Sequence, residues 1–439
     1  MRARSGSTSG AASRGGARGL IPGLSLVVAM LLTTIACEST PRPSAPTPAA
    51  IASIQLGPRP FYLIDRMPAG ALRDRLAACQ DGPFRTSRFS IGHRGAPMQF
   101  PEHTRESYLA AARMGAGTIE CDVTATRDGE LVCRHAACDL ARTTNILETP
   151  LASRCRESFR PAAFDPESGA LSRPASARCC TADLTLAEFL ELEGRMDAAD
   201  HAATTVTEYL DATPAYRTDL YANGGQLMSH DESLRLFREL GVAMTPELKG
   251  PAPDAQETLV ERAASARALL SAYQRAGISP QDVRLQSFFL DDLRTWLEAD
   301  PELGARAVWL IETAASKPPT PAELAARSEE GIRTLGVPIA MLLRLDGDGE
   351  LRASELALQA RAVGLELIAW TLERSGRIRA GRVEGSDRDF YLDPVLPALG
   401  NDGDLYRVIH ALATEVGVVG VFSDWPATTT YYANCFGLE

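Results

Sequence analysis

Eight short apolar segments alternate with longer amphipathic segments between Phe89 and Phe422, and this alternation limits the possible folds more than any other feature of the chain. Each apolar segment has the length of a strand, and the segments between them are long enough for helices. The predicted strands are Phe89–Gly92, Thr118–Thr124, Val242–Leu248, Val283–Phe288, Ala305–Ile311, Pro338–Leu342, Leu365–Thr371 and Val418–Phe422. The clearest predicted helices are Arg105–Met114, Glu257–Gln274, Asp291–Leu297, Ser354–Ala362 and Leu405–Glu415. The pattern predicts an α/β protein, a closed parallel TIM (β/α)8 barrel.

Reactive and charged side chains gather at or near the ends of these strands. They are His93, Glu120, Asp122, Glu247, Lys249, Gln286, Trp370 and Asp424. Barrel enzymes carry their chemistry at the C-terminal ends of the strands. This placement predicts one site at one mouth of the barrel, assembled from segments far apart in the sequence.

Glu120 and Asp122 are two residues apart on a predicted strand, so both carboxylates point to one face and Cys121 to the other. Two adjacent acids repel each other unless a cation or a proton lies between them. An exposed edge strand would also carry such charges, but the flanking Ile119 and Val123 argue against exposure. The pair therefore predicts a cation site.

Two histidines follow strands in the same region. His93 precedes Arg94 and Gly95, and His135 ends a hairpin whose turn is Asp128-Gly129. A single histidine is more often structural, but the chain has only six histidines, and two of them lie at strand ends near a carboxylate pair. Together they favour acid–base catalysis.

Lys249 is one of only two lysines among 45 lysines and arginines. It follows Glu247 by two residues, so the two side chains share a face of the predicted strand. Because lysine is a compact point charge, it fits beside a metal and a phosphate where a forked guanidinium does not.

These motifs occur in an order that resembles the glycerophosphodiester phosphodiesterase family. The matching segments are His93-Arg94-Gly95, Pro101-Glu102-x-Thr104, Glu120-x-Asp122, Asp128-Gly129, His135 with Leu140-x-Arg142-Thr143-Thr144-Asn145, Thr185 to Leu190, Pro246 to Lys249, Gln286 to Phe288, Trp370-Thr371 and Gly420 to Pro426. The resemblance extends in segments from Phe89 to Pro426 and implies the same barrel.

The resemblance implies metal-dependent hydrolysis of a small glycerophosphodiester or lysolipid, with release of glycerol 3-phosphate and an alcohol such as choline or ethanolamine. Glu120, Asp122 and Glu247 would bind one divalent cation, calcium or magnesium, because oxygen ligands suit hard ions. Catalysis would use His93 and His135 as acid and base, with the glycerol's own hydroxyl attacking first. The implied substrate- and phosphate-binding residues are Arg94, Lys249, Glu102, Gln286 and Trp370, with Glu102 orienting His93 or a substrate hydroxyl.

The chain departs from the family at two points. His103 stands where the family usually has Asn, which is either a neutral exchange in a loop or a change in the glycerol pocket. Ala136-Ala137 replace an Asp-Pro after the second histidine, which could alter how the His135 imidazole is held.

The first 36 residues have the composition of an export signal, with arginines before an apolar run from Leu20 to Ile35. Cys37 follows a small residue, which resembles a bacterial lipoprotein site, although Thr34 stands where Leu is usual. A membrane-anchored lipoprotein, periplasmic or at the cell surface, is therefore predicted, with an ordinary secreted protein and a retained membrane anchor as the alternatives. Residues 37–50 form a Pro/Ser/Thr-rich tether, and residues 51–88 an N-terminal extension before the barrel domain of residues 89–439.

An insertion of residues 136–235, approximately, follows the second strand and could cover the site. Its stretch from Arg160 to Arg178 is rich in Pro, Ser and Ala and is predicted to be loop. Nine cysteines in an exported chain predict disulfides. The preferred pairs are Cys133–Cys138, Cys155 with Cys179 or Cys180, and Cys79–Cys435, with Cys121 as a buried free thiol.

The net charge of −11 argues against a nucleic acid partner, because phosphate backbones need a basic surface. Two other functions stay open. One is phospholipase D-like cleavage of lysophospholipid or sphingolipid head groups, which an apolar groove beside the metal would favour. The other is a non-catalytic surface protein that binds phosphodiesters. The sequence does not specify an oligomeric state.

Overall fold

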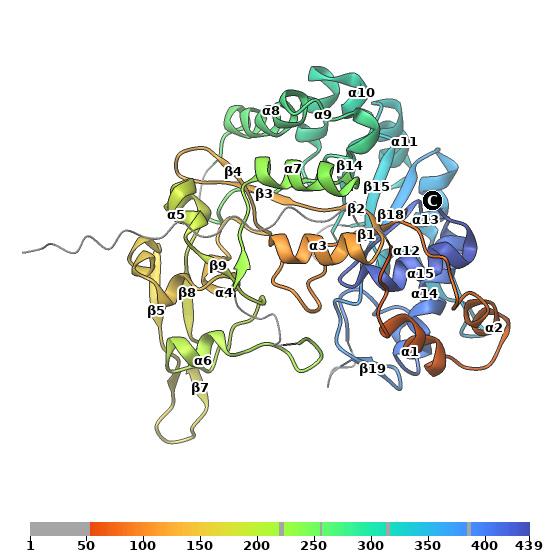
Figure 1. The fold of residues 1–439 in the computed structure, drawn as a ribbon, viewed down its shortest axis with the longest axis horizontal. Coiled ribbons are helices and arrows are strands. Elements are labelled where there is room, and N and C mark those ends of the chain that lie inside the picture. Colours follow the sequence, from red (N-terminus) through yellow and green to blue (C-terminus); the bar gives the residue numbers. More distant parts are fainter. Residues whose placement is uncertain (1–52, 219–223, 255–256, 313–316, 384–387) are drawn as a thin grey trace, which may run out of the picture. The chain divides into compact units, whose positions relative to one another are not determined.

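The described part of the chain, residues 53–218, 224–254, 257–312, 317–383 and 388–439 of a computed structural model, is built around one mainly parallel sheet (Figure 1). Its parallel strands are β1 (Ser87–Gly92), β2 (Ala116–Ile119), β3 (Asp122–Ala125), β11 (Ala243–Met244), β12 (Glu247–Leu248), β13 (Gln286–Ser287), β14 (Val308–Leu310), β15 (Thr334–Pro338), β18 (Glu366–Leu372) and β21 (Gly420–Ser423). The antiparallel β4 (Leu131–Cys133) pairs with β3. The predicted signal, the tether up to residue 50 and Cys37 lie outside the described residues.

The sheet closes on itself, although two of its barrel strands are interrupted in the middle. The chain passes from β2 through Glu120 and Cys121 into β3, while β11 pairs with β2 and β12 with β3. If β2 with β3 and β11 with β12 are read as single strands, the order is β1, β2/β3, β11/β12, β13, β14, β15, β18 and β21, and β21 pairs back onto β1. The predicted TIM barrel is confirmed.

Helices connect the barrel strands, and one more helix follows the last strand. They are α3 (Arg105–Arg113), α7 (His230–Leu240), α8 (Leu259–Arg275), α9 (Leu290–Ala299), α10 (Pro301–Gly304), α11 (Pro321–Glu329), α12 (Ile339–Leu342), α13 (Glu355–Ala362), α14 (Leu405–Ala411), which continues as a π-helix at Leu412–Val416, and α15 (Pro426–Phe436). Hydroxyl side chains cap many of them: the Thr104 side chain accepts the Ser107 N–H, and Ser229 and Thr258 form capping boxes with Glu232 and Glu261. None of the described helices is long and apolar enough to cross a membrane.

One predicted strand is misplaced. The sequence predicted a strand at Pro338–Leu342, but β15 ends at Pro338 and the apolar residues after it form the buried helix α12. Proline has no N–H to continue a ladder, and a short apolar run does not distinguish a strand from a buried helix.

Small elements complete the barrel domain. The chain adds the hairpins β16 (Leu343–Leu345) with β17 (Leu351–Ala353) and β19 (Ile378–Arg379) with β20 (Arg382–Val383), and short 3-10 helices at Pro280–Asp282, Leu396–Ala398 and Asp402–Asp404.

The N-terminal extension folds onto the end of the chain. It contains α1 (Arg59–Arg66) and α2 (Ala71–Ala77). The Tyr431 hydroxyl of α15 donates to the Leu76 carbonyl at 2.7 Å, and the Phe61 ring meets the Tyr431 ring edge to face. Arg59 forms a 2.7 Å ion pair with Glu373, which directly follows β18. The extension is therefore linked to a barrel strand through charge as well as packing.

The insertion has more regular structure than the sequence predicted. It contains α4 (Leu140–Thr143), 3-10 helices at Ile146–Glu148, Pro150–Arg154 and Thr181–Asp183, β5 (Glu157–Arg160), β6 (Ala163–Phe164), β7 (Leu171–Arg173), β8 (Ser176–Arg178), α5 (Leu186–Leu190), β9 (Glu193–Gly194), α6 (Val206–Leu210) and β10 (Gly225–Gln226). The prediction of loop from Arg160 to Arg178 was wrong, because β5 pairs with β8 and β6 with β7. A small core that includes Phe189 and Leu192 supports the insertion beside β4 (Figure 1).

Three disulfides are present in the described residues: Cys121–Cys133, Cys138–Cys180 and Cys155–Cys179. The last confirms one predicted pair. The other predictions were wrong. Cys133 forms its disulfide with Cys121, which was expected to be a free thiol. Cys79 and Cys435 are not joined in a disulfide. Pairing across the β3–β4 hairpin brings Cys121 and Cys133 together, a contact between strands that sequence spacing does not reveal.

Candidate active site

A cavity of about 460 Å³ lies where the C-terminal ends of the barrel strands meet, and it collects nearly all the predicted site residues. From the prediction it is lined by His93, Arg94, Glu120, Asp122, His135, Glu247, Lys249, Gln286 and Trp370. Glu102 lies behind Arg94 and does not line the cavity.

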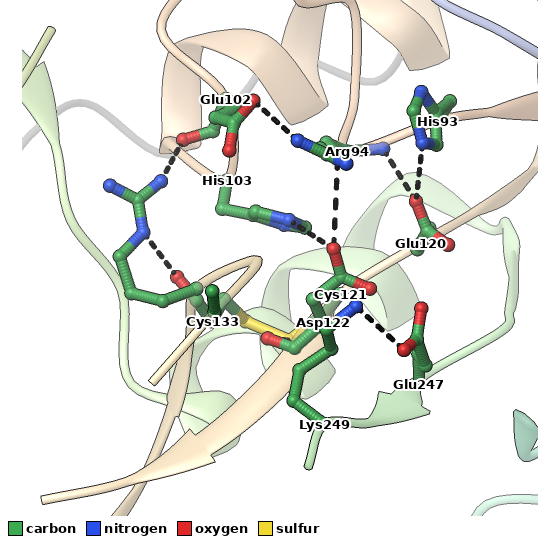
Figure 2. Close-up of polar contacts among 12 residues, drawn as sticks. His93, Arg94, Glu102, His103, Glu120, Cys121, Asp122, Cys133, Glu247 and Lys249 are labelled. Atoms are coloured by element: carbon green, nitrogen blue, oxygen red, sulfur yellow. Dashed lines mark hydrogen bonds and ion pairs between the residues drawn. A yellow bond between two sulfur atoms is a disulfide. The ribbon is translucent and has the colours of Figure 1, made fainter. Parts of the chain in front are cut away.

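Three carboxylates converge in one corner of the cavity (Figure 2). Glu120, Asp122 and Glu247 each offer an oxygen, and these oxygens lie within 4.8 Å of one another. Glu120 lies in the break between β2 and β3, and Asp122 begins β3. Glu247 begins the neighbouring β12, directly opposite Asp122 in the ladder. Parallel pairing thus brings together acids that are far apart in the sequence.

Neighbouring groups hold Glu120 in place. The Arg94 backbone N–H donates to its Oε2 at 2.9 Å, and the Gln286 side-chain amide donates to its Oε1 at 2.8 Å. Burial, together with Asp122 and Glu247, raises the pKa of Glu120 well above its ordinary value. The carboxylate is thus fixed in position while its negative charge is poorly compensated.

Asp122 is held from behind by His103. The Nε2 of His103 lies 2.9 Å from Oδ2 of Asp122, and His103 Nδ1 lies 3.0 Å from the Tyr108 hydroxyl. Burial alone would raise the pKa of Asp122, but Lys249 and His103 outweigh it and lower the pKa. His103 is buried outside the cavity lining, so this departure from the family changes the support of Asp122 rather than the wall of the cavity.

Lys249 faces Glu247, with Nζ 2.6 Å from Oε1. Burial still raises the pKa of Glu247 to about 7, against the opposing effect of Lys249. Burial is the main cause of both raised carboxyl pKa values, and the negative charge of neighbouring acids adds to it.

The residues of this corner fit a hard divalent cation. All three candidate ligands are carboxylates, and the buried Oδ1 of Asp122 has no hydrogen-bond partner. Oxygen donors without sulfur or nitrogen match calcium or magnesium. A cation would offset the burial and the repulsion between acids that together raise the pKa of Glu120 and of Glu247.

His93 is paired with Asp424, which follows β21. The His93 Nδ1 lies 2.5 Å from Asp424 Oδ1, and Nε2 points toward Glu120 Oε2 at 3.9 Å. Burial outweighs Asp424 and lowers the pKa of His93 to about 4. Asp424 also contacts Arg374 at 3.1 Å and Arg217 at 3.5 Å, and the pKa of this carboxyl is lowered to about 2.

His135 lies between two further carboxylates. Ligand atoms of Glu102, His135 and Asp139 lie within 4.8 Å of one another. The Ala136 backbone N–H donates to Asp139 Oδ2 at 3.0 Å. Asp139 therefore brings a carboxylate near the imidazole although Ala136-Ala137 replace the family's Asp-Pro. Burial, with Arg94 and Lys249, lowers the pKa of His135.

Arg94 lies between two of the acids, Glu102 and Asp122. Its guanidinium donates to Glu102 at 2.9 Å and lies 3.7 Å from Asp122, while its backbone has a φ of 54°. Arg374 also approaches Glu102, at 3.5 Å. The cavity thus presents arginine and lysine cations close to the three acids, as an anionic ligand bound through a metal requires.

The opposite wall is aromatic. The Trp370 ring has centroids of Phe288, Phe390 and Tyr391 at 6.1, 6.0 and 6.1 Å. All four rings line the cavity. One side of the cavity therefore suits a phosphate and the other an apolar or cationic group.

The sequence reading missed several residues of the site. Arg374 and Arg217 had no recognisable motif, and Asp424 was placed at a strand end and in a family segment but was given no role in the site. Arg142 and Asp197, which line the cavity and form an ion pair at 3.4 Å, belong to the insertion. Their proximity depends on the fold of the insertion, so no local pattern in the sequence indicated it.

Comparison with known proteins identifies one matching family. The model of the glycerophosphoryl diester phosphodiesterase family matches residues 93–428. A protein of Arthroderma benhamiae named "Extracellular protein" is 42% identical over 252 residues, which are 55% of this chain and all of that protein. The glycerophosphodiester phosphodiesterase of Bacillus subtilis is 46% identical over 56 residues, 13% of this chain and 19% of that enzyme.

Among solved structures, one from Silicibacter pomeroyi, assigned as a glycerophosphoryl diester phosphodiesterase, superimposes with a TM-score of 0.50 at 20% identity. The match covers 82% of this chain and 96% of that one, and at this identity it shows a common fold.

Proposed function

The chain belongs to the glycerophosphoryl diester phosphodiesterase family, and we propose that it hydrolyses small glycerophosphodiesters to glycerol 3-phosphate and an alcohol with one divalent cation and two histidines. The observation that carries the proposal is the meeting of three carboxylates, Lys249 and both His93 and His135 at one cavity. The cavity has room for a substrate with a few polar atoms and a small head group.

Glu120, Asp122 and Glu247 would hold calcium or magnesium. When bound, the cation supplies positive charge that orients a phosphate oxygen and stabilises the charge that develops on it. Arg94 and Lys249 add fixed positive charge close to the same acids, so the phosphoryl group is stabilised without rearrangement of the protein.

The two imidazoles would move the protons. A glycerol hydroxyl forms a bond to phosphorus as one histidine takes its proton. The bond from phosphorus to the alcohol oxygen breaks as the other histidine gives that oxygen a proton, and water then opens the cyclic phosphate to glycerol 3-phosphate. His93 is prepared for such a role, because Asp424 holds Nδ1 and leaves Nε2 directed into the cavity. Its lowered pKa keeps the ring neutral near pH 7, so Nε2 can accept a proton.

Glu102, Gln286 and Trp370 would support binding rather than chemistry. Glu102 anchors the Arg94 guanidinium, Gln286 fixes Glu120, and Trp370 forms the aromatic wall.

The test is release of glycerol 3-phosphate from glycerophosphocholine, with and without EDTA. Activity should disappear with EDTA, return with calcium or magnesium, and fall at least about 100-fold in His93→Ala. His201→Ala, which changes an exposed histidine of the insertion, is the matched control and should keep full activity. If wild type and His93→Ala release glycerol 3-phosphate at the same rate, the proposed hydrolase mechanism is wrong. A protein that only binds phosphodiesters would then be the better interpretation.

We also propose that the chain is exported and anchored through a lipid on Cys37. Three disulfides and the likeness to a protein named extracellular support export. The lipid is tested by detergent phase separation, in which wild type should enter the detergent phase and Cys37→Ser the aqueous phase. Aqueous partitioning of both would indicate secretion without an anchor.

A further inference from the structure

A buried ion pair lies behind the strands that carry Lys249 and Gln286. Arg262 on α8 is only 7% exposed, and Asp292 on α9 is fully buried. Nε of Arg262 donates to Oδ1 of Asp292 at 2.9 Å, and Nη2 donates to Oδ2. Arginine and aspartate are almost never buried unless they are paired, so the two side chains depend on each other.

The other donors of Arg262 hold the end of β12. Nη1 donates to the Lys249 carbonyl at 2.5 Å, and Nη2 donates to the Leu248 carbonyl at 3.1 Å. The residue pair that joins β12 to β13 precedes both residues, so these carbonyls lie past the end of the ladder. On the other edge of β12, the Lys249 N–H donates to the Val123 carbonyl at 3.1 Å. The backbone of Lys249 is therefore fixed from both sides.

Asp292 extends the same support to β13. The Ser287 hydroxyl donates to Oδ2 of Asp292 at 2.6 Å. Ser287 directly follows Gln286, whose side-chain amide donates to Glu120. Arg262 and Asp292 thus bridge the exits of two neighbouring strands whose inward side chains line the cavity.

The planar guanidinium is essential to this arrangement. Two further groups contact Arg262: Oε2 of Glu257 lies 3.7 Å from Nη1, and the Phe289 ring centroid lies 4.3 Å from Cζ. Neither contact reaches the end of β12. An ammonium group is a single point of charge without a fork, so a lysine at this position would not hold Asp292 and both carbonyls together.

The place of the Lys249 backbone determines where its side chain acts. Lys249 alternates with Leu248 along the chain, so its side chain points into the cavity on the same side as Glu247. Its Nζ lies 2.6 Å from Oε1 of Glu247 (Figure 2). A shift of the strand end would therefore move the ammonium group away from the three acids and from any phosphate bound beside them.

We propose that Arg262, held by Asp292, is a positioning residue that sets the place of the Lys249 ammonium group and thereby the binding of the phosphoryl group. The proposal rests on the proposed function, in which Lys249 stabilises that group. Arg262 does not line the cavity, so it acts through Lys249 and not on the substrate.

Arg262→Lys tests the proposal, because it keeps a cation beside Asp292 and loses the bonds to the two carbonyls. The inhibition constant of glycerol 3-phosphate should rise about tenfold, and kcat/KM for glycerophosphocholine should fall about tenfold. The matched control is Arg284→Lys. Arg284 donates to Thr334 at 2.8 Å and to Glu366 at 2.9 Å, but at the starts of the barrel strands, so both constants should change less than about twofold.

A double-variant cycle separates positioning from a general weakening of the fold. If Arg262 acts through Lys249, adding Arg262→Lys to Lys249→Ala should lower kcat/KM less than about twofold further. A weakening unrelated to Lys249 would instead multiply the two losses. If Arg262→Lys folds poorly, Arg262→Gln/Asp292→Asn removes both buried charges together and should show the same dependence on Lys249.

Multiplied losses in the cycle, or a wild-type inhibition constant in Arg262→Lys, would overturn the positioning role while hydrolysis by the wild type stands. If the wild type releases no glycerol 3-phosphate from glycerophosphocholine in the presence of calcium or magnesium, the proposed function fails and the role of Arg262 fails with it.

Discussion

Nδ1 of His93 lies 2.5 Å from Oδ1 of Asp424, a residue 331 positions further along the chain. The contact joins the exits of β1 and β21, which are neighbours in the closed barrel. It directs one ring nitrogen toward Asp424 and the other toward the cavity. Asp424 in turn accepts from Arg374, so its charge is held in place.

Asp424→Asn should lower kcat for glycerophosphocholine about 100-fold, because the amide no longer favours the same ring orientation and charge of His93. The protein should also unfold at a lower temperature, because Arg374 and Arg217 lose their buried anion, so kcat is measured well below the unfolding transition. Asp282→Asn, at the opposite end of the barrel strands, is the control and should leave kcat unchanged. An Asp424→Asn enzyme with wild-type kcat would remove Asp424 from the mechanism.

Glu120→Gln should stabilise the metal-free protein while it weakens metal binding. Burial, Asp122 and Glu247 raise the pKa of Glu120, so its charge is unfavourable when no cation is present. In wild type, calcium at 100 times its Kd should add about 2.7 kcal/mol to the free energy of unfolding. Calorimetry with EDTA and with calcium measures both effects, and a calcium-induced shift in Glu120→Gln equal to wild type would contradict the ligand role.

Arg59→Gln should destabilise the protein by roughly 3 kcal/mol, because it leaves Glu373 buried without its cation. The double variant Arg59→Gln/Glu373→Gln should recover much of this loss. If the single and double variants unfold at the same denaturant concentration, the ion pair does not link the extension to β18.

The loss in Arg59→Gln should also grow with pH. Burial raises the pKa of Glu373 even in the intact pair, so the folded state binds the proton more tightly than the unfolded chain does. The free energy of unfolding therefore decreases as the pH rises above the ordinary carboxyl pKa, about 4.3. Urea unfolding of Arg59→Gln at pH 4.5 and pH 7.5 should give the smaller free energy at pH 7.5, and a larger value there would contradict the sign.

Removing the Cys121–Cys133 disulfide with paired Cys→Ser changes should cost about 3 kcal/mol of stability and also lower kcat. The bond joins Cys121, which lies between the two acids Glu120 and Asp122, to Cys133. Cys133 ends β4, two residues before His135. Removal of Cys155–Cys179, within the insertion, should cost similar stability with less effect on kcat. Equal kcat losses in the two variants would show that the first bond has no special relation to the site.

Much of the fold could be predicted because barrel strands are apolar on both faces and are separated by helices. Phe89–Gly92 and Leu365–Thr371 are found almost as predicted in β1 and β18. The prediction for the segment after Pro338 was wrong because a short apolar run is compatible with both a buried helix and a strand. The helices of the N-terminal extension were not predicted at all.

The candidate site was predictable where its residues follow strand periodicity or a family motif, as Glu120, Asp122 and Glu247 do. Arg217 and Asp197 could not be predicted, because only the folded insertion brings Arg217 to Asp424 and Asp197 to the cavity lining. The prediction of disulfide partners failed for a related reason: Cys121 and Cys133 meet through strand pairing, not through closeness in the sequence.

The pairing of β21 with β1 has a consequence for biosynthesis. During translation the His93 segment emerges long before Gly420 to Asp424, so a ribosome-bound chain lacks the partner of His93 and one wall of the barrel. No fragment that ends before Gly420 can have a working centre, however much of the cation site it contains. Premature stop codons ahead of Asp424 should therefore behave as complete losses of activity.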